Sequence, residues 1–317
     1  MPDVISVVIP LYNKARHIRR ALDSVLAQTS QDLEVIVVND GSTDGSDDVV
    51  RRYTEPRLRL VNQENAGASA ARNRGIAEAR ADLIAFLDAD DEWLQGHLAT
   101  IVRLSERFPE CGAYATAYEM VDRQDGRRRP EFAGVPPPPW EGVIANYFHL
   151  CPEPICSSSV AVPKRVFDSV GPFPIGVQRG EDSDMWCRIA LKYPIAFSTR
   201  VGAVYHQEAD NRICVQCPAP LLQEHCFTRL VDDALKSGNR PPGTTPNDLV
   251  EYRNWKFTAI ADELAAAGNA AGAREYLRRA VSTRRHRLPW MRAWMLSFVP
   301  ASMRAALRKL RRAGGDE

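Results

Sequence analysis

Short apolar runs alternate with helical patterns along the first hundred residues. The runs, rich in β-branched residues, cover 5–9, 33–38, 58–61 and 83–87. Apolar runs of this length are typical of parallel strands buried on both faces. Between the runs, apolar spacing predicts helices over 18–26, 45–50 and 68–79. The alternation predicts an α/β fold with right-handed crossovers and a mostly parallel sheet flanked by helices.

The remaining two thirds of the chain give a more mixed pattern. We predict helices over 94–108 and 181–191 and strands over 113–121 and 201–205. The prolines at 136–139 indicate an extended connector. From residue 221 the pattern is helical with a break at 237–247, and 259–280 is rich in helix-forming residues. We therefore expect an α/β domain over 1–220, with halves 1–110 and 111–220, followed by a helical extension over 221–317.

Polar residues gather directly after each of the four predicted strands. They include Pro10, Tyr12 and Asn13, then 40–45, then Asn65, Gly67 and Arg72, and finally Asp88, Asp90 and Asp91. Ligands of open parallel sheets bind outside the carboxyl ends of the strands. A crevice here could recognise a nucleotide through an aromatic ring, a carboxylate and a cation. The alternatives are turns and helix caps for 40–45 and 65–67, and a core position for Tyr12.

Two groups of acids are candidates for catalysis. Asp88, Asp90 and Asp91 repel one another unless a cation relieves them, and carboxylates suit Mg²⁺ or Mn²⁺ bridging a diphosphate. Glu181 and Asp182 begin a predicted helix, where acids serve either as caps or as a catalytic base. His206 follows a predicted strand and is either structural or a further metal ligand.

Four segments carry a resemblance to a known family. They are 6–13 (SVVIPLYN), 37–44 (VVNDGSTD), 65–75 (NAGASAARNRG) and 86–91 (FLDADD), and Glu181-Asp182 adds an acidic pair. Together they resemble family-2 glycosyltransferases of the GT-A fold over about residues 4–210. The resemblance implies an inverting transferase that moves a sugar from a nucleoside diphosphate, usually UDP, to an acceptor hydroxyl. It also implies a role in cell-surface polysaccharide or glycan synthesis, with a glycan or lipid-linked acceptor.

The resemblance also implies roles for individual residues. The nucleotide-binding set is Pro10, Tyr12, Asn13, Asp40, Asn65, Gly67, Arg72 and Asp88, with Asp40 accepting from a uracil N–H. Asp182 matches the general base, with Glu181 beside it. Mn²⁺ or Mg²⁺ would be held by Asp90, Asp88 and, as in some members, His206. A non-catalytic nucleotide or sugar binder remains the alternative.

The C-terminal segment has a charge of its own. The whole chain carries +1, but residues 274–312 hold 12 Lys and Arg against one acid, Glu275. A stripe of Trp, Met and Phe lies among these arginines over 290–299. Such a segment either binds an anionic membrane surface or packs on the rest of the protein. We expect no nucleic-acid partner.

Other classes of protein lack support. A dehydrogenase would need GxGxxG after the first strand, where 10–13 reads PLYN. An aspartate-nucleophile phosphatase would carry its DxD there rather than at 88–90. The pair Cys214 and Cys217 is weak evidence for zinc without a second spaced pair. With no apolar span and no basic leader before the run 4–11, we expect a cytoplasmic protein, with the inner face of the cell membrane as its site of peripheral contact.

Overall fold

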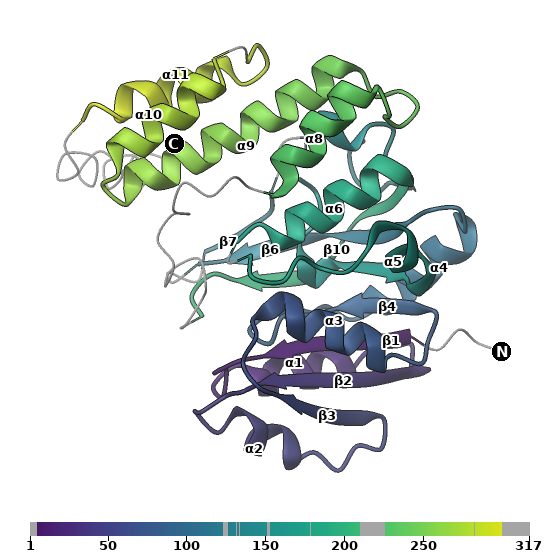
Figure 1. Cartoon of the computed structure of the whole chain (residues 1–317). Helices are drawn as coiled ribbons and strands as arrows, with labels where there is room; N and C mark the ends of the chain where they lie inside the picture. The colour runs from purple at the N-terminus through teal and green to yellow at the C-terminus, as the bar shows by residue number, and fades with distance from the viewer. Residues whose placement is uncertain are drawn as a thin grey trace. The chain divides into compact units, whose positions relative to one another are not determined.

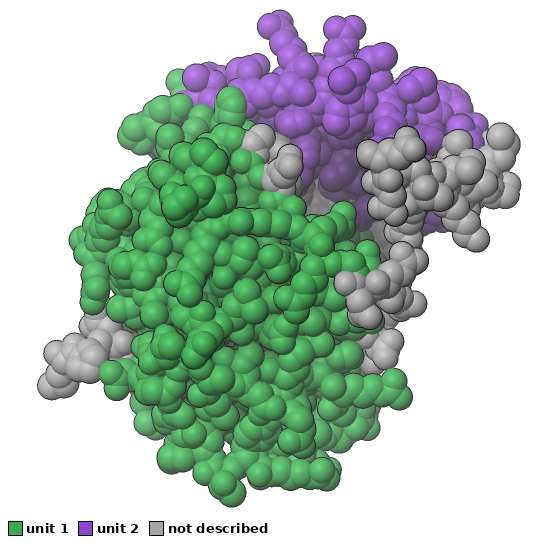
Figure 2. Space-filling model, turned by 180° about the vertical axis from the view of Figure 1, so that it is seen from behind, with its two compact units in different colours: residues 1–212, 239–243 green, residues 213–238, 244–317 purple. Residues whose placement is uncertain are grey.

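A computed structural model gives the arrangement of the chain. It describes residues 5–122, 126–130, 132, 134–150, 153–177, 179–209, 226–281 and 283–299. The chain divides into two compact units, which Figure 2 colours separately: residues 1–212 with 239–243, and residues 213–238 with 244–317. The pair Cys214 and Cys217, which is weak evidence for zinc in the sequence, lies outside the described residues.

The described part of the first unit is built on one ten-stranded mixed sheet (Figure 1). Its main path runs β3-β2-β1-β4-β9-β6-β10-β5, with β7 paired to β6 and β8 to β10. The strands are β1 Ile5–Leu11, β2 Leu33–Asp40, β3 Leu58–Gln63, β4 Leu83–Phe86, β5 Glu92–Trp93, β6 Ala113–Val121, β7 Arg127–Arg128, β8 Glu141–Val143, β9 Val160–Pro163 and β10 Ile195–His206. The four strands predicted from the first hundred residues are thereby confirmed and pair in parallel as β3-β2-β1-β4.

The second half of the sheet departs from the parallel pattern. Strand β9 is antiparallel to both β4 and β6, whereas β6 and β10 are parallel to each other. β9 therefore joins two parallel groups of strands. Its four residues are too short a run to be recognised by periodicity, and β10 begins at Ile195, six residues before the strand that the apolar pattern indicated.

Helices cover both faces of the sheet. They are α1 Ile18–Leu26, α2 Ser46–Arg51, α3 Ala68–Glu78, α4 His97–Arg107, α5 Lys164–Val170 and α6 Glu181–Lys192, with 3₁₀ turns η1 Tyr147–His149 and η2 Ser157–Ser159. The apolar sides of α1 and α4 share a core with the odd-numbered side chains of β1. On the other face, Phe86 of β4 packs edge-on against Phe167 and Phe173, and Phe173 packs against Trp186 of α6.

Helix α3 approaches the sheet very closely, and a glycine makes this possible. A Cβ atom at Gly75 would lie 2.2 Å from Cγ1 of Val8 in β1. Only a residue without a side chain fits there. This contact sets the distance of α3 from the sheet, and so the place of Arg72, one turn earlier in the helix.

The second unit is helical in its described part. It comprises α8 Cys226–Ser237, α9 Pro246–Ala266, α10 Ala270–Arg279 and α11 Arg287–Leu296. The predicted break at 237–247 is confirmed, and Asn269 caps α10 with a bond from Gly272 N to Oδ1 of 2.9 Å. Phe257, Leu264 and Tyr276 lie in its core, against which Trp290 and Trp294 of α11 pack. No helix in the described ranges is both long and apolar enough to span a bilayer.

Candidate active site at the carboxyl ends of the strands

Asp40 ends β2 and organises the loop that leads into α3. One of its oxygens accepts from Gln63 Nε2 at 2.7 Å and Ala66 N at 2.9 Å, and the other accepts from Gly67 N at 2.9 Å. Gly67 has a φ of 90°, a conformation in which a side chain would be strained. Asp40 therefore holds Asn65, Gly67 and the start of α3 at one strand end, and its contact with a base stays a prediction.

The end of β1 lies beside this loop. Asn13 has a φ of 51°, and its side-chain oxygen accepts from Thr43 N at 2.8 Å. Tyr12 is 47% exposed, which rules out the alternative that it is a core residue. Pro10 pairs with Val38 in the sheet. The polar segments after the first two strands are thus joined by hydrogen bonds, as their position at one edge of the sheet predicted.

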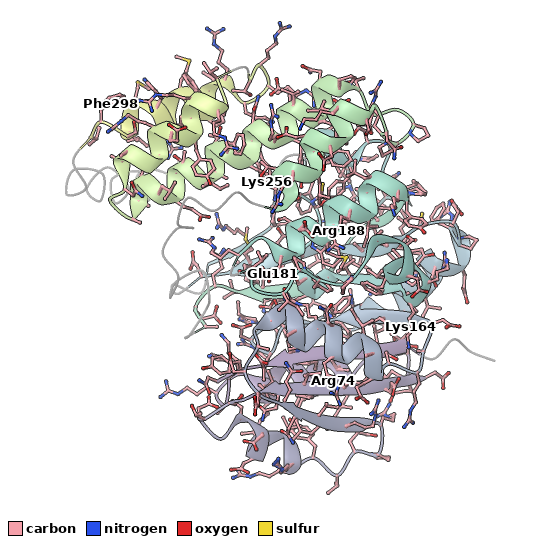
Figure 3. The ribbon with its side chains drawn as sticks, in the orientation of Figure 1. Arg74, Lys164, Glu181, Arg188, Lys256 and Phe298 are labelled. Atoms are coloured by element: carbon pink, nitrogen blue, oxygen red, sulfur yellow. The ribbon has the colours of Figure 1, made fainter. Side chains whose placement is uncertain are left out.

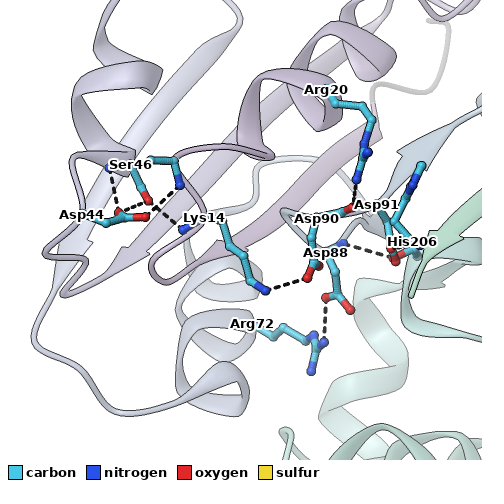
Figure 4. Close-up of polar contacts among 11 residues, drawn as sticks. Lys14, Arg20, Asp44, Ser46, Arg72, Asp88, Asp90, Asp91 and His206 are labelled. Carbon is cyan, nitrogen blue, oxygen red and sulfur yellow. Dashed lines mark hydrogen bonds and ion pairs between the residues drawn. The ribbon is translucent and has the colours of Figure 1, made fainter. Parts of the chain in front are cut away.

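Arg72 connects the two halves of the first unit. Its Nη2 lies 2.8 Å from Asp88 Oδ1, and its Nη1 lies 3.0 Å from Glu181 Oε1 (Figure 4 shows the first contact). The arginine is only 4% exposed, and its guanidinium lies over the ring of Phe173. Burial alone would lower the pKa of Arg72, but the two carboxylates outweigh it and raise that pKa above its ordinary value.

Glu181 and Asp182 begin α6, and Figure 3 labels Glu181 at this end of the helix. Burial raises the pKa of Glu181, the neighbouring charge of Asp182 raises it further, and Arg72 opposes both. Asp182 accepts from Ser183 N at 2.7 Å. Its charge also contributes, after burial, Glu153 and Cys187, to the raised pKa of Tyr147, which places Asp182 near that phenol. Only one acid of the pair, Glu181, is bound to the arginine.

The acids after β4 have three different surroundings. Asp88 contacts Arg72, whereas Asp90 Oδ2 lies 2.6 Å from Lys14 Nζ. The carbonyl of Asp90 also accepts from Arg20. Asp91 is buried and accepts from Ser158 Oγ at 2.5 Å and from the backbone N–H of His206 at 2.9 Å. Burial, then the charges of Asp90 and Asp88, raise the pKa of Asp91 well above its usual range.

His206 ends β10 next to this segment (Figure 4). Its Nδ1 lies 2.5 Å from Glu208 Oε1, and its Nε2 lies 3.3 Å from Glu92 Oε1. The nearby imidazole of His206 lowers the pKa of Glu92 more than burial raises it. The imidazole faces a carboxylate on each side, so it would have to give up one of them to ligate a metal. Its role as a ligand remains a prediction.

The carboxylates fit a divalent cation in one particular manner. Within the described ranges, no three or more His, Cys, Asp or Glu side chains are arranged to hold a metal ion by themselves. Mg²⁺ and Mn²⁺, however, are commonly held by one or two carboxylates together with substrate phosphates. Asp88 and Asp90 would supply these two carboxylates from one short turn, which is closed by a bond of 3.0 Å from Asp91 N to Asp88 O.

Several residues of this network were not recognised in the sequence. Lys14, Arg20 and Ser158 contact the acids after β4, although each lies about 70 residues or more from its partner. Lys14 directly follows the YN pair that comes after β1, and this position was its only available signal. Arg20 looked like an ordinary polar position on an amphipathic helix.

Known glycosyltransferases are similar in sequence to the part of the chain that forms this site. The model of the glycosyl transferase family 2 matches residues 6–164, just over half of the chain. YibD of Escherichia coli, an uncharacterized glycosyltransferase, is 51% identical over 90 residues, which are 28% of this chain and 26% of YibD. The glycosyltransferase GlyA of Streptococcus pneumoniae is 40% identical over 103 residues, 32% of this chain and 15% of GlyA. These alignments therefore cover about a quarter or less of each relative.

Solved structures show the same fold over a longer stretch. The crystal structure of residues 1–349 of Staphylococcus aureus TarS with UDP-GlcNAc aligns with a TM-score of 0.56 at 18% identity. The alignment covers 91% of this chain and 79% of that one. A second TarS structure contains UDP. The chain belongs to glycosyl transferase family 2 and has the GT-A-like α/β fold with a helical C-terminal portion, as the motifs predicted.

Proposed function

We propose that this glycosyltransferase moves a sugar from a nucleoside diphosphate donor to an acceptor hydroxyl, with inversion at the anomeric carbon. The nucleotide of the proposed donor is UDP. The observation that carries the proposal is the pair of contacts from Arg72 to Asp88 and Glu181. They bring the predicted donor-binding acids and the predicted catalytic acids to one buried guanidinium. The UDP and UDP-GlcNAc found in the TarS structures support a nucleotide donor.

The donor would lie across the ends of β1, β2 and β4. Tyr12 offers an exposed ring for stacking on the base, and Asp40 with its loop marks the base end of the site. Pro10, Asn13, Asn65 and Gly67 shape the same edge of the sheet. Asp88 would face the ribose or the metal, and Arg72 keeps its carboxylate in position.

The chemical step is assigned to Asp182. The carboxylate removes the proton of the acceptor hydroxyl as its oxygen attacks the anomeric carbon, and the bond from that carbon to the diphosphate breaks. A single displacement inverts the configuration, so no enzyme nucleophile is needed. General-base help of this kind contributes about 10²–10⁴-fold. Glu181, held by Arg72, fixes the start of α6, which carries Asp182.

Mn²⁺ or Mg²⁺ is the proposed cofactor, with Asp90, Asp88 and His206 as the residues that would hold it. A bound divalent cation would offset the negative charge of the departing diphosphate. Asp91 holds the backbone of His206 in place, because it accepts hydrogen bonds from both Ser158 and the backbone N–H of His206.

The acceptor is proposed to be a glycan or a lipid-linked saccharide at the membrane surface, in polysaccharide synthesis. Helix α11 supports the membrane contact. Trp290 and Trp294 pack into the second unit, and Trp290 Nε1 donates to Leu277 O at 2.8 Å. Leu288, Met291 and Met295 are instead exposed, at helical spacing. The net positive charge of residues 274–312 matches an anionic lipid surface.

A screen of donors tests the proposal. Thermal melting is measured with a panel of nucleoside diphosphate sugars, each with and without Mn²⁺. The proposal predicts a higher melting temperature with one donor and a larger rise when Mn²⁺ is present. The selected donor is then tested for transfer or hydrolysis. Binding without any turnover would favour the alternative, a non-catalytic nucleotide or sugar binder, and no binding by any donor would contradict both.

A further inference from the structure

The ion pair between Lys14 and Asp90 joins two strand ends of the site. Lys14 follows β1, and Asp90 follows β4, 76 residues later. The two side chains are only 12% and 14% exposed, so water screens the contact of 2.6 Å less than at an open surface. The lysine therefore neutralises the acid that is the foremost candidate for a metal ligand.

The backbone of Lys14 is held in place from the other side. Its N–H donates to Ser46 Oγ at 2.8 Å, and the next N–H, of Ala15, donates to Asp44 Oδ2 at 2.9 Å. Ser46 and Asp44 are themselves hydrogen-bonded (Figure 4). The main chain is thus anchored to the loop after β2, while the flexible four-carbon side chain reaches across to Asp90.

A divalent cation and this ammonium would compete for Asp90. Both are attracted to the same carboxylate, and they repel each other at the short distances that a shared oxygen imposes. The diphosphate of a donor brings negative oxygens to the same edge of the sheet. An ammonium carries three hydrogen-bond donors, so phosphate oxygens can replace the carboxylate as its acceptors.

We propose that Lys14 is a diphosphate-binding residue that pairs with Asp90 only while the site is empty of metal and donor. The inference rests on the proposed function for its ligand. In the empty site the lysine holds Asp90 and lowers the affinity for the metal alone. In the loaded site it contacts the diphosphate, so the metal and the donor favour each other's binding.

The test measures binding rather than turnover. Mn²⁺ is titrated into nucleotide-free protein and followed by the electron paramagnetic resonance of free Mn²⁺. The Lys14→Met variant should bind Mn²⁺ about fivefold or more tightly than the wild type, because the competing cation is gone. With Mn²⁺ present, its affinity for UDP should fall about tenfold or more, whereas its affinity for uridine should not change.

Two variants serve as controls. Lys14→Arg keeps the charge and should behave like the wild type within about threefold on both ligands. Lys192→Met removes a lysine from the far end of α6, where it donates to Ser169 O, and should change neither affinity. Thermal melting of each variant establishes that it is folded.

The outcomes separate this inference from the proposed function. Unchanged Mn²⁺ affinity in Lys14→Met, or an equal loss for UDP and uridine, would overturn the role of Lys14. A wild-type protein that binds no UDP would instead contradict the proposed donor. In that case the Mn²⁺ titration would still test whether Lys14 competes with the metal for Asp90. Unaltered Mn²⁺ binding by Lys14→Met would refute this competition.

Discussion

Arg72 Nη1 and Glu181 Oε1 lie 3.0 Å apart, although 109 positions separate the two residues in the chain. The contact joins α3, which belongs to the motif-rich first hundred residues, to α6, which lies in the half over 111–220. Because Arg72 also binds Asp88, one guanidinium links a proposed donor-binding acid to Glu181, the neighbour of the proposed base Asp182.

Removal of Arg72 should destabilise the fold and abolish donor binding. Arg72→Met leaves Asp88 and Glu181 without their cation, which should lower the free energy of unfolding by about 3 kcal/mol. The effect stays at the lower end of the range for buried pairs because Asp88 remains partly exposed. Adding Glu181→Gln should recover about 1 kcal/mol relative to the sum of the single changes. Urea unfolding of the four proteins checks this, and strict additivity would mean that the pair is not coupled.

The close approach of α3 to β1 gives a second prediction. Gly75→Ala should lower the free energy of unfolding by about 1–3 kcal/mol, because the new methyl group overlaps Val8. In the double variant with Val8→Ala, the loss should be smaller than the sum of the two single losses, since the colliding methyl groups are gone. Chemical denaturation measures both. A Gly75→Ala protein as stable as the wild type would show that the helix can move away at no cost.

The lowered pKa of Glu34, at the start of β2, predicts how the free energy of unfolding should change with pH. Its carboxylate accepts from Ser6 Oγ at 2.6 Å and Arg80 N at 2.7 Å. Burial alone would raise the pKa of Glu34, but these bonds and Arg59 lower it below its ordinary value. Its contribution to stability is therefore present above the unfolded pKa, about 4.3, and is lost as the pH falls through the lower folded value.

The corresponding variant is Glu34→Gln, which lies away from the carboxyl ends of the strands. Its deficit in unfolding free energy, relative to the wild type, should be largest near neutral pH and should shrink as the pH falls below about 4. Urea unfolding at several pH values measures the difference. A deficit that grows in acid would contradict the direction assigned to this pKa.

The membrane proposal predicts that three exposed side chains of α11 carry lipid binding. The protein should sediment with vesicles that contain phosphatidylglycerol and should do so much less with phosphatidylcholine alone. Changing Leu288, Met291 and Met295 to Ser should abolish the sedimentation. Ile175→Ser removes an exposed apolar residue of the first unit and is the matched control. Equal binding by both variants would count against α11 as the contact.

The four strands whose carboxyl ends carry the candidate site could be predicted from the sequence. Buried parallel strands need continuous apolar runs, and the polar residues that follow them must then lie at one edge. Asp40, Asp88 and Asp90 were chosen as candidate site residues in this way. The contacts of these acids were not, since Lys14 and Ser158 are brought to them only by the fold.

The features that were missed in the sheet and in the helical unit likewise depend on contacts made by the fold rather than on local sequence pattern. β9 and β5 are four and two residues long, so pairing with neighbours, not local pattern, makes them strands. In α11 the stripe of apolar residues at 290–299 looked like a single surface. The structure divides it, because Trp290 and Trp294 pack inward while Met291 and Met295 are exposed.

The most direct test of the account is the turnover of the selected nucleoside diphosphate sugar by Asp182→Asn, with the dissociation constant of the donor measured on the same protein. Turnover should be about 10²–10⁴-fold below the wild type and the dissociation constant should be unchanged, because the base acts only in the chemical step. Wild-type turnover in Asp182→Asn would contradict it.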